Sequence, residues 1–207
     1  MKSGIRTVQS GSIVAETKAE GISNAMMTDL EIYKAQLVEA AHNSSNEVFT
    51  NPDNGHAIKA FSVLFDNTTH KISLLAKDFN GDISNNPEYV DSLKKCLLRN
   101  VEVEILTLET PKNSEGFNEF LKYKASGKKV TIKKASEESK KILDDFSSES
   151  LLYFGQIFNL QIFDDNKYRI EYNPDEYSAL LSFSDKEITA KYYSKFKEAF
   201  LKADIIA

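Results

Sequence analysis

Polar side chains recur at every second position along two short stretches near the C-terminal end of the chain. Lys167, Arg169 and Glu171 follow one another at this interval, and so do Asn159 and Gln161. Residues two apart in a strand project from the same face, so each set would form a row. Together the rows offer hydrogen bonds to a polar or phosphate-containing ligand. The alternative, and the commoner arrangement, is a strand face whose charged side chains are simply hydrated.

These rows lie on a predicted β-hairpin. Apolar residues recur among polar ones over 157–162, and apolar and polar residues alternate strictly over 168–172, which is the period of a β-strand. The connection, Asp164-Asp165-Asn166, consists of residues that favour turns. Adjacent carboxylates also attract cations, but calcium binds six or more oxygens. We therefore interpret Asp164 and Asp165 as part of a turn rather than as a metal site.

Other reactive residue types give little sign of a metal or cofactor site. His42, His56 and His70 have no second histidine or cysteine at a metal-ligand spacing. The single cysteine, Cys96, lies on the apolar face of a predicted helix and is expected to be buried. Glycine-rich phosphate loops and Gly-x-Ser-x-Gly motifs are absent from the sequence. We therefore expect no cofactor and no bound metal.

The charge balance disfavours nucleic acid as a partner of the whole surface. The chain has 26 basic and 31 acidic residues and a net charge of −5, so nucleic acid would need a local basic patch. The most basic stretch contains Lys122, Lys124, Lys128, Lys129, Lys133 and Lys134. This stretch fits a nucleic-acid groove, but it also fits a hydrated helix end beside an edge strand, which is the more usual arrangement.

Hydrophobic spacing predicts alternating helices and strands. Helices are expected at residues 28–42, 56–66, 86–97, 114–127, 136–146 and 184–200. Strands are expected at residues 71–77, 101–106, 128–132, 157–162, 168–172 and 177–183. The first and last helices begin with apparent capping boxes, Thr28 with Glu31 and Ser184 with Glu187.

This order of elements indicates an α/β fold. Strands that alternate with helices between residues 71 and 132 pair in parallel through right-handed crossovers, whereas the last three strands are joined too tightly for that. The sequence therefore predicts a mixed sheet of six to seven strands with helices on both faces.

The length of 207 residues suits one domain. Residues 1–25 contain few large apolar side chains, so we expect a flexible tail, followed by a single α/β domain at 26–207 with an N-terminal helix. The run Ser23-Asn24-Ala25-Met26 resembles the remnant of a cleaved expression tag. Long apolar stretches typical of membrane spans or signal peptides are absent from the sequence, so we expect a cytoplasmic protein without a membrane partner.

The order of elements and a few residues resemble one unit of the phospholipase-D-like superfamily. The helical run SLKKCLLRN before the strand VEVEIL is similar to a superfamily segment in which a helix ends in an arginine-bearing turn. The hairpin run FDDNKYRIE resembles a strand pair that degenerate members retain. The resemblance covers residues from about 71 to 203 and implies a phospholipase-D-like unit.

The resemblance also implies where a site would lie. In active members the strand before the acidic turn carries a His-x-Lys pair, whose histidine is the nucleophile. Aligning the acidic turns places Asn159 and Gln161 at these positions, and the third-strand Gly-Ser-x-Asn counterpart is altered at residues 181–184; only Asp164 and Asp165 look kept. An amide cannot attack phosphorus as an imidazole does, so the resemblance implies a unit without covalent phosphodiesterase chemistry.

The leading hypothesis is therefore a catalytically inactive phospholipase-D-like domain that serves as a binding or assembly module in a bacterial cell. Its hypothetical ligand-binding residues are Asn159, Gln161, Arg169 and Glu171. Superfamily sites combine two units, so a chain with one unit is expected to form a homodimer.

Two other functions remain open at this point. The first is a metal-dependent nuclease or phosphodiesterase that uses the hairpin carboxylates Asp164, Asp165 and Glu171. The second, weaker hypothesis is a nucleic-acid-binding regulator that uses the lysines between Lys122 and Lys134.

Overall fold

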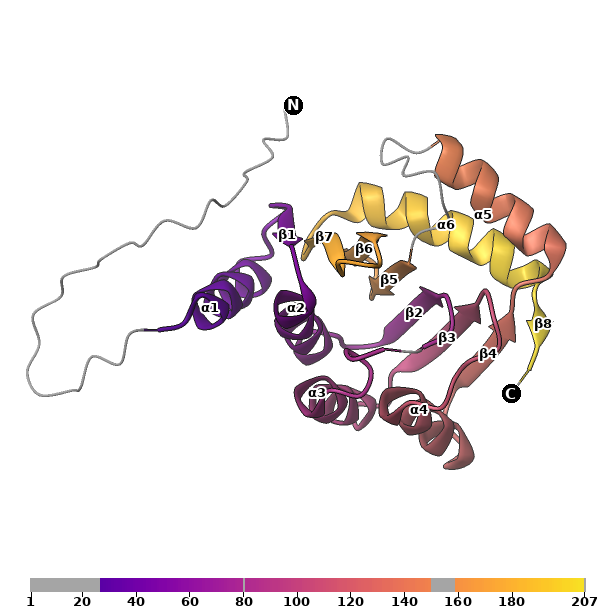
Figure 1. Cartoon of the computed structure of the whole chain (residues 1–207), viewed down its shortest axis with the longest axis horizontal. Coiled ribbons are helices and arrows are strands. Elements are labelled where there is room, and N and C mark those ends of the chain that lie inside the picture. The colour runs from indigo at the N-terminus through magenta and orange to yellow at the C-terminus, as the bar shows by residue number, and fades with distance from the viewer. Residues whose placement is uncertain (1–26, 80, 150–158, 207) are drawn as a thin grey trace, which may run out of the picture.

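The computed structural model describes residues 27–79, 81–149 and 159–206, so the predicted tail at 1–25 lies outside the described part of the chain. Eight strands form one mixed sheet in the order β1-β7-β6-β5-β2-β3-β4-β8 (Figure 1). The strands are β1 (Phe49–Asn51), β2 (Lys71–Ala76), β3 (Glu102–Thr107), β4 (Val130–Lys134), β5 (Asn159–Phe163), β6 (Lys167–Asn173), β7 (Ser178–Ser182) and β8 (Asp204–Ile205). The helices are α1 (Asp29–His42), α2 (Asn54–Asp66), α3 (Pro87–Leu97), α4 (Glu115–Ala125), α5 (Glu137–Glu149) and α6 (Lys186–Lys202).

Strands β2, β3 and β4 form the parallel part of the sheet, which the alternation of strands and helices in the sequence predicted. β2, β3 and β4 pair in parallel and are joined by α3 and α4, as the sequence predicted. Asn86 caps α3 by accepting a hydrogen bond from the backbone of Glu88, and Ser114 caps α4 in the same way. β2 is apolar and buried on both faces of the sheet, as expected for an inner parallel strand.

The antiparallel part brings the hairpin against the end of β2. β5 pairs antiparallel with β2, and Leu160 lies opposite Leu75. The first residues of β5 therefore lie beside the last residues of β2. β6 and β7 continue the antiparallel pairing outward, with a register irregularity between Glu171 and Asn173. This arrangement places the polar rows of the hairpin near the loop that follows β2.

Helices cover both faces of the sheet, as predicted (Figure 1). α2, α3 and α4 pack against one face, with α1 outside α2, and their core includes Phe65 and Phe120. α5 and α6 pack together on the other face, where Tyr192 and Phe196 are buried. Cys96 is buried in the first of these cores, which agrees with the interpretation of a packed thiol.

Three details of the fold differ from the predictions. β1 and β8 contain three and two residues, too few to show a hydrophobic period, and each exists because it pairs with a sheet edge, β7 or β4. The sheet consequently has eight strands instead of six to seven. The N-cap of α6 is Asp185, whose side chain accepts from the backbone of Ile188, so the predicted capping box of Ser184 with Glu187 is wrong.

Candidate functional site: a polar pocket at the end of strand β2

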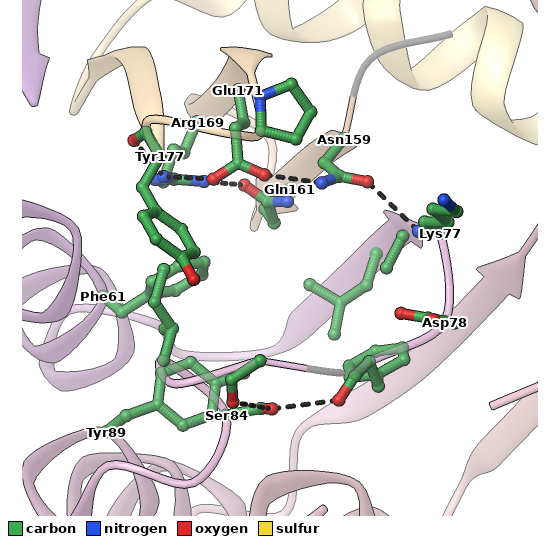
Figure 2. A pocket seen from close by; sticks show the side chains of 16 residues that line it. Phe61, Lys77, Asp78, Ser84, Tyr89, Asn159, Gln161, Arg169, Glu171 and Tyr177 are labelled. Atoms are coloured by element: carbon green, nitrogen blue, oxygen red, sulfur yellow. Dashed lines mark hydrogen bonds and ion pairs between the residues drawn. The ribbon is translucent and has the colours of Figure 1, made fainter. Parts of the chain in front are cut away.

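A cavity with a volume of about 220 Å³ lies where the C-terminal end of β2 meets β5 and β6 (Figure 2). The four residues that the sequence suggested as ligand-binding residues all line it: Asn159, Gln161, Arg169 and Glu171. The first pair comes from β5 and the second from β6, and the two strands pair Asn159 with Glu171 and Gln161 with Arg169. The hairpin register therefore brings the two polar rows to one place.

Arg169 lies at the centre of this polar cluster and is 1% exposed. Its Nε donates to Asn51 Oδ1 at 3.1 Å, and its Nη1 donates to Gln161 Oε1 at 3.0 Å. Its Nη2 donates to Glu171 Oε1 at 2.9 Å and to the Tyr177 carbonyl at 3.3 Å. A guanidinium has five N–H groups, so these bonds use most of its donor capacity.

The network fixes the orientation of the two amides. Arginine only donates hydrogen bonds, so the atom of Gln161 that faces Arg169 is the oxygen, and Nε2 faces away from it. Asn159 donates from Nδ2 to the Glu171 carboxylate and accepts at Oδ1 from the backbone N–H of Lys77 at 3.1 Å. Asn159 thus links the hairpin to the loop after β2.

The charges around the pocket are paired. The buried Arg169 guanidinium neutralises Glu171, and the Asp78 carboxylate binds the Lys112 ammonium at 2.8 Å. Lys77 lies on the rim, where its side chain is 65% exposed and strongly hydrated. Among the described lining residues, no buried cation is left without a carboxylate partner. A phosphate-containing ligand, one of the ligand types that the sequence suggested, would therefore meet no unpaired buried cation here.

An apolar and aromatic wall faces the polar residues. It contains Phe61, Phe79, Ile83, Tyr89 and Tyr177. The Phe61 ring lies under the Arg169 guanidinium, 4.8 Å from ring centre to Cζ. Burial raises the pKa of the Tyr89 hydroxyl, which therefore stays protonated at physiological pH.

Tyr177 has a strained backbone at the edge of the pocket. Its φ is +58°, in the left-handed region that residues other than glycine rarely adopt. Its carbonyl accepts hydrogen bonds from Asn51 Nδ2 and Arg169 Nη2, which hold this conformation. Figure 2 shows that the Tyr177 ring extends over the cavity. The polar network therefore also positions an aromatic side chain of the wall.

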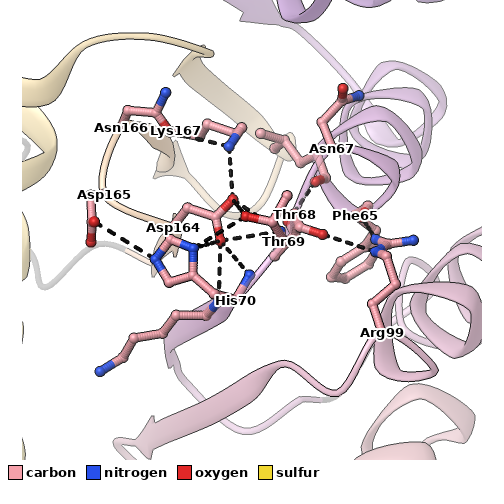
Figure 3. Close-up of polar contacts among 12 residues, drawn as sticks. Phe65, Asn67, Thr68, Thr69, His70, Arg99, Asp164, Asp165, Asn166 and Lys167 are labelled. Carbon is pink, nitrogen blue, oxygen red and sulfur yellow. Dashed lines mark hydrogen bonds and ion pairs between the residues drawn. The ribbon is translucent and has the colours of Figure 1, made fainter.

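Lys167, the third member of the predicted row on β6, does not reach the pocket. Its ammonium donates to Asp164 Oδ2 at 2.9 Å at the hairpin turn (Figure 3). Asp164 also accepts from the backbone N–H groups of Thr69, His70 and Lys71, at 2.9–3.2 Å. Burial alone would raise the pKa of Asp164, but Lys167 and these N–H groups outweigh it and lower the pKa. Asp164 is therefore a structural residue that fastens the turn to the start of β2.

The hairpin carboxylates do not converge on one point. Asp164 is tied to the backbone, and Asp165 is 88% exposed. Lys167 is the first residue of β6 after the turn, and Glu171 follows it by four residues. At the rise of a strand, Glu171 is therefore about 14 Å from the turn. In the described part of the chain, no group of three or more histidine, cysteine, aspartate or glutamate side chains could hold a metal ion. None of His42, His56 and His70 lines the pocket.

The lysine-rich stretch is divided between different surroundings. Lys122 pairs with Glu119, and Lys128 donates to Asn100. Lys133 donates to the carbonyl of Phe200, and Lys134 donates to Thr110. Four of the six lysines therefore contact different partners, one of which, Phe200, lies on α6.

Several residues of the site were not recognised in the sequence. Asn51 sits on the short β1, and Tyr177 sits in the loop between β6 and β7, far from each other in sequence. Phe61 falls within the predicted helix at 56–66, and Asp78 directly follows the predicted strand at 71–77, so neither was named as a site residue. The Asn-Pro pair at the end of β1 and the Pro174 turn mark loops, but nothing local in either segment indicates that both reach Arg169.

No helix among the described residues is long and apolar enough to cross a membrane. In sequence comparisons, the chain matches no protein-family model and no curated protein.

Comparison with solved structures identifies the fold. The chain resembles Nuc from Salmonella typhimurium, a phospholipase D family member, with a TM-score of 0.51 and 12% identity over 77% of this chain and 96% of that one. It also resembles TrmBL2, an archaeal chromatin protein described as having a novel mode of DNA binding, with a TM-score of 0.54 and 17% identity over 84% of this chain and 60% of that one. The chain therefore has a phospholipase-D-like fold, as the sequence predicted.

Proposed function

We propose that this protein is a catalytically inactive phospholipase-D-like domain that acts as a binding and assembly module in the form of a homodimer. The observation that carries the proposal is the presence of two amides, Asn159 and Gln161, in the pocket where the resemblance would place an imidazole and an ammonium. The lone pair of an amide nitrogen is delocalised, so neither side chain can serve as the nucleophile. Their hydrogen-bonding groups remain suited to holding a ligand.

The positions of the histidines support the absence of the family reaction. The chain contains three histidines, all within the described residues, and each lies away from the pocket. His70, for example, lies at the hairpin turn beside Asp164. A covalent phosphohistidine intermediate in this pocket would therefore lack its nucleophile.

A hydrolysis assay tests the catalytic part of the proposal. We expect the protein to hydrolyse bis(p-nitrophenyl) phosphate no faster than buffer, both with EDTA and with added Mg²⁺ or Mn²⁺. Metal-dependent hydrolysis that disappears in Glu171→Gln would overturn the proposal and establish the nuclease or phosphodiesterase alternative. Glu109→Gln is the matched control, because Glu109 is an exposed carboxylate outside the pocket.

The assembly part of the proposal is tested separately. The resemblance to a superfamily whose sites combine two units motivates a homodimer in solution. Sedimentation velocity at micromolar concentration should show a dimer of the 23.3 kDa chain. A strictly monomeric protein would contradict the assembly role and leave the catalytic part of the proposal unaffected.

A further inference from the structure

One donor and one acceptor remain next to each other in the pocket after its internal hydrogen bonds are counted. Nε2 of Gln161 points away from Arg169, and it has no hydrogen-bond partner among the described residues. Each oxygen of Glu171 receives one N–H, from Arg169 or Asn159, and keeps a further lone pair. Gln161 and Glu171 are neighbours because both bind the same guanidinium, through Nη1 and Nη2 (Figure 2).

The free donor belongs to a side chain that is mostly buried and faces the cavity. Gln161 is 6% exposed, so its amide has little contact with bulk water outside the cavity. Arg169 holds the oxygen end of the amide and prevents the side chain from turning its nitrogen elsewhere. A ligand that accepts from Nε2 would recover this hydrogen bond.

The charge balance selects an uncharged ligand. Arg169 is already neutralised by Glu171, and Asp78 is already paired with Lys112. An anion placed against Gln161 would lie beside the Glu171 carboxylate with no unpaired buried cation among the described lining residues. Its desolvation and the repulsion from Glu171 would therefore remain uncompensated.

The shape and the walls select a small planar ligand. The cavity of about 220 Å³ lies below the range of about 300–1,000 Å³ that is typical of sites for drug-sized molecules. The rings of Phe79 and Tyr177 give it flat surfaces, and Ile83 adds an apolar one. A ring of one or two cycles can stack on such surfaces while its polar edge faces the hairpin.

We propose that the pocket binds an uncharged planar heterocycle that presents a carbonyl beside an N–H, the lactam edge found in uracil and hypoxanthine. Gln161 Nε2 donates to the ligand carbonyl, and the Glu171 carboxylate accepts from the ligand N–H. This inference rests on the proposed function, because it requires a pocket that binds its ligand without cleaving it.

A comparison of three probes on the wild-type protein tests the ligand class. Uracil carries the lactam edge, 1,3-dimethyluracil lacks both ring N–H groups, and inorganic phosphate carries the charge of a phosphodiesterase substrate. In a titration followed by protein NMR, we expect uracil to bind about tenfold or more tightly than 1,3-dimethyluracil. Phosphate should leave the signals of the pocket residues unchanged.

A pair of matched variants tests the role of Gln161. Gln161→Glu keeps an oxygen for Arg169 and replaces the Nε2 donor by an acceptor, so uracil binding should weaken about tenfold or more. Gln36→Glu introduces the same charge change on α1, outside the pocket, and should bind uracil as the wild type does. Thermal unfolding of both variants checks that the fold is intact, and the wild-type probe comparison does not depend on either variant.

The outcomes separate this inference from the proposed function. Equal binding of uracil and 1,3-dimethyluracil, uracil binding unaffected by Gln161→Glu, no binding of uracil, or tighter binding of phosphate would each overturn the lactam proposal. A failure of this kind without phosphodiester hydrolysis would leave the inactive binding module in place. Hydrolysis in the assay described above would overturn the proposed function itself.

Discussion

At its turn the β5–β6 hairpin buries a carboxylate among backbone donors, whereas from its middle toward its open end it buries a guanidinium among side-chain acceptors. Asp164 binds the N–H groups of Thr69, His70 and Lys71, which belong to the main chain before and at the start of β2. Arg169 instead binds several side chains and one carbonyl gathered from separate segments.

The two sets of contacts indicate different roles: those of Asp164 hold the fold together, whereas those of Arg169 also shape the pocket. Asp164 binds three main-chain N–H groups, and its charge is matched by Lys167. Two of the four partners of Arg169, Asn51 and Gln161, are amides that carry a donor as well as an acceptor, and Gln161 keeps a free donor in the cavity. We therefore expect changes at the turn to affect folding and changes at the open end to affect binding as well.

The largest effect on stability is expected from Arg169→Met. This change leaves the buried Glu171 carboxylate without its countercharge and should lower the free energy of unfolding by about 3–5 kcal/mol. Urea denaturation at neutral pH measures the change. The double variant Arg169→Met/Glu171→Leu should recover part of the loss because it buries no isolated charge. Lys77→Met, at the exposed rim, should stay within about 0.5 kcal/mol of the wild type.

Asp164→Ala should have the next largest effect. It removes the acceptor for three backbone N–H groups and for Lys167, and we expect a loss of about 2–3 kcal/mol in the same denaturation experiment. The neighbouring Asp165→Ala is the matched control, because Asp165 is 88% exposed. Equal effects of the two substitutions would show that the turn carboxylates are hydrated and would remove the contrast between the two ends of the hairpin.

A smaller effect is expected from pH. The pKa of Asp164 is lowered in the folded state, so its carboxylate stabilises the fold fully above its unfolded pKa of about 3.9. This stabilisation is lost as the pH falls through the lower folded value. The difference in unfolding free energy between the wild type and Asp164→Ala should therefore be constant from pH 7 to about pH 5 and should shrink below about pH 4. A difference that instead grows on acidification would show that protonated Asp164 is the form the fold prefers.

The smallest effect is expected from the lysine-rich stretch. Lys128 and Lys129 are exposed, and Lys133 is engaged with Phe200, so Lys128→Ala/Lys129→Ala should leave stability and binding of duplex DNA near the wild-type values. Fluorescence anisotropy with labelled DNA at several salt concentrations measures the binding. Salt-sensitive binding that the double substitution abolishes would favour the nucleic-acid-binding hypothesis. It would place the binding surface at α4 and β4 instead of at the hairpin.

The sequence predicted most of the fold because its long elements carry strong periodic signals. The buried run of β2 and the apolar face of α6, with Tyr192 and Phe196, are apparent from spacing alone. The short edge strands β1 and β8 escaped notice because two or three residues show no period. The cap at Asp185 was missed because Ser184 and Asp185 are both good capping residues, and the final turn geometry chose between them.

The candidate site was predictable only in part. Alternation on the hairpin put Asn159 with Gln161 and Arg169 with Glu171 on common faces, and the antiparallel register then joined the two pairs. The same alternation wrongly suggested that Lys167 belongs with them, although the hairpin turn directs it to Asp164.

The sequence by itself determined that polar residues of complementary kinds would share one face of a hairpin, because a strand has a period of two. Only the tertiary structure decided which of their charges would be cancelled. Asn51 and Tyr177 reach Arg169 from distant segments, and Glu171 neutralises the Arg169 guanidinium that could otherwise have bound a phosphate group. The physical reason is that hydrogen bonds in a buried network depend on which groups meet in space, and burial leaves each donor or acceptor few other partners.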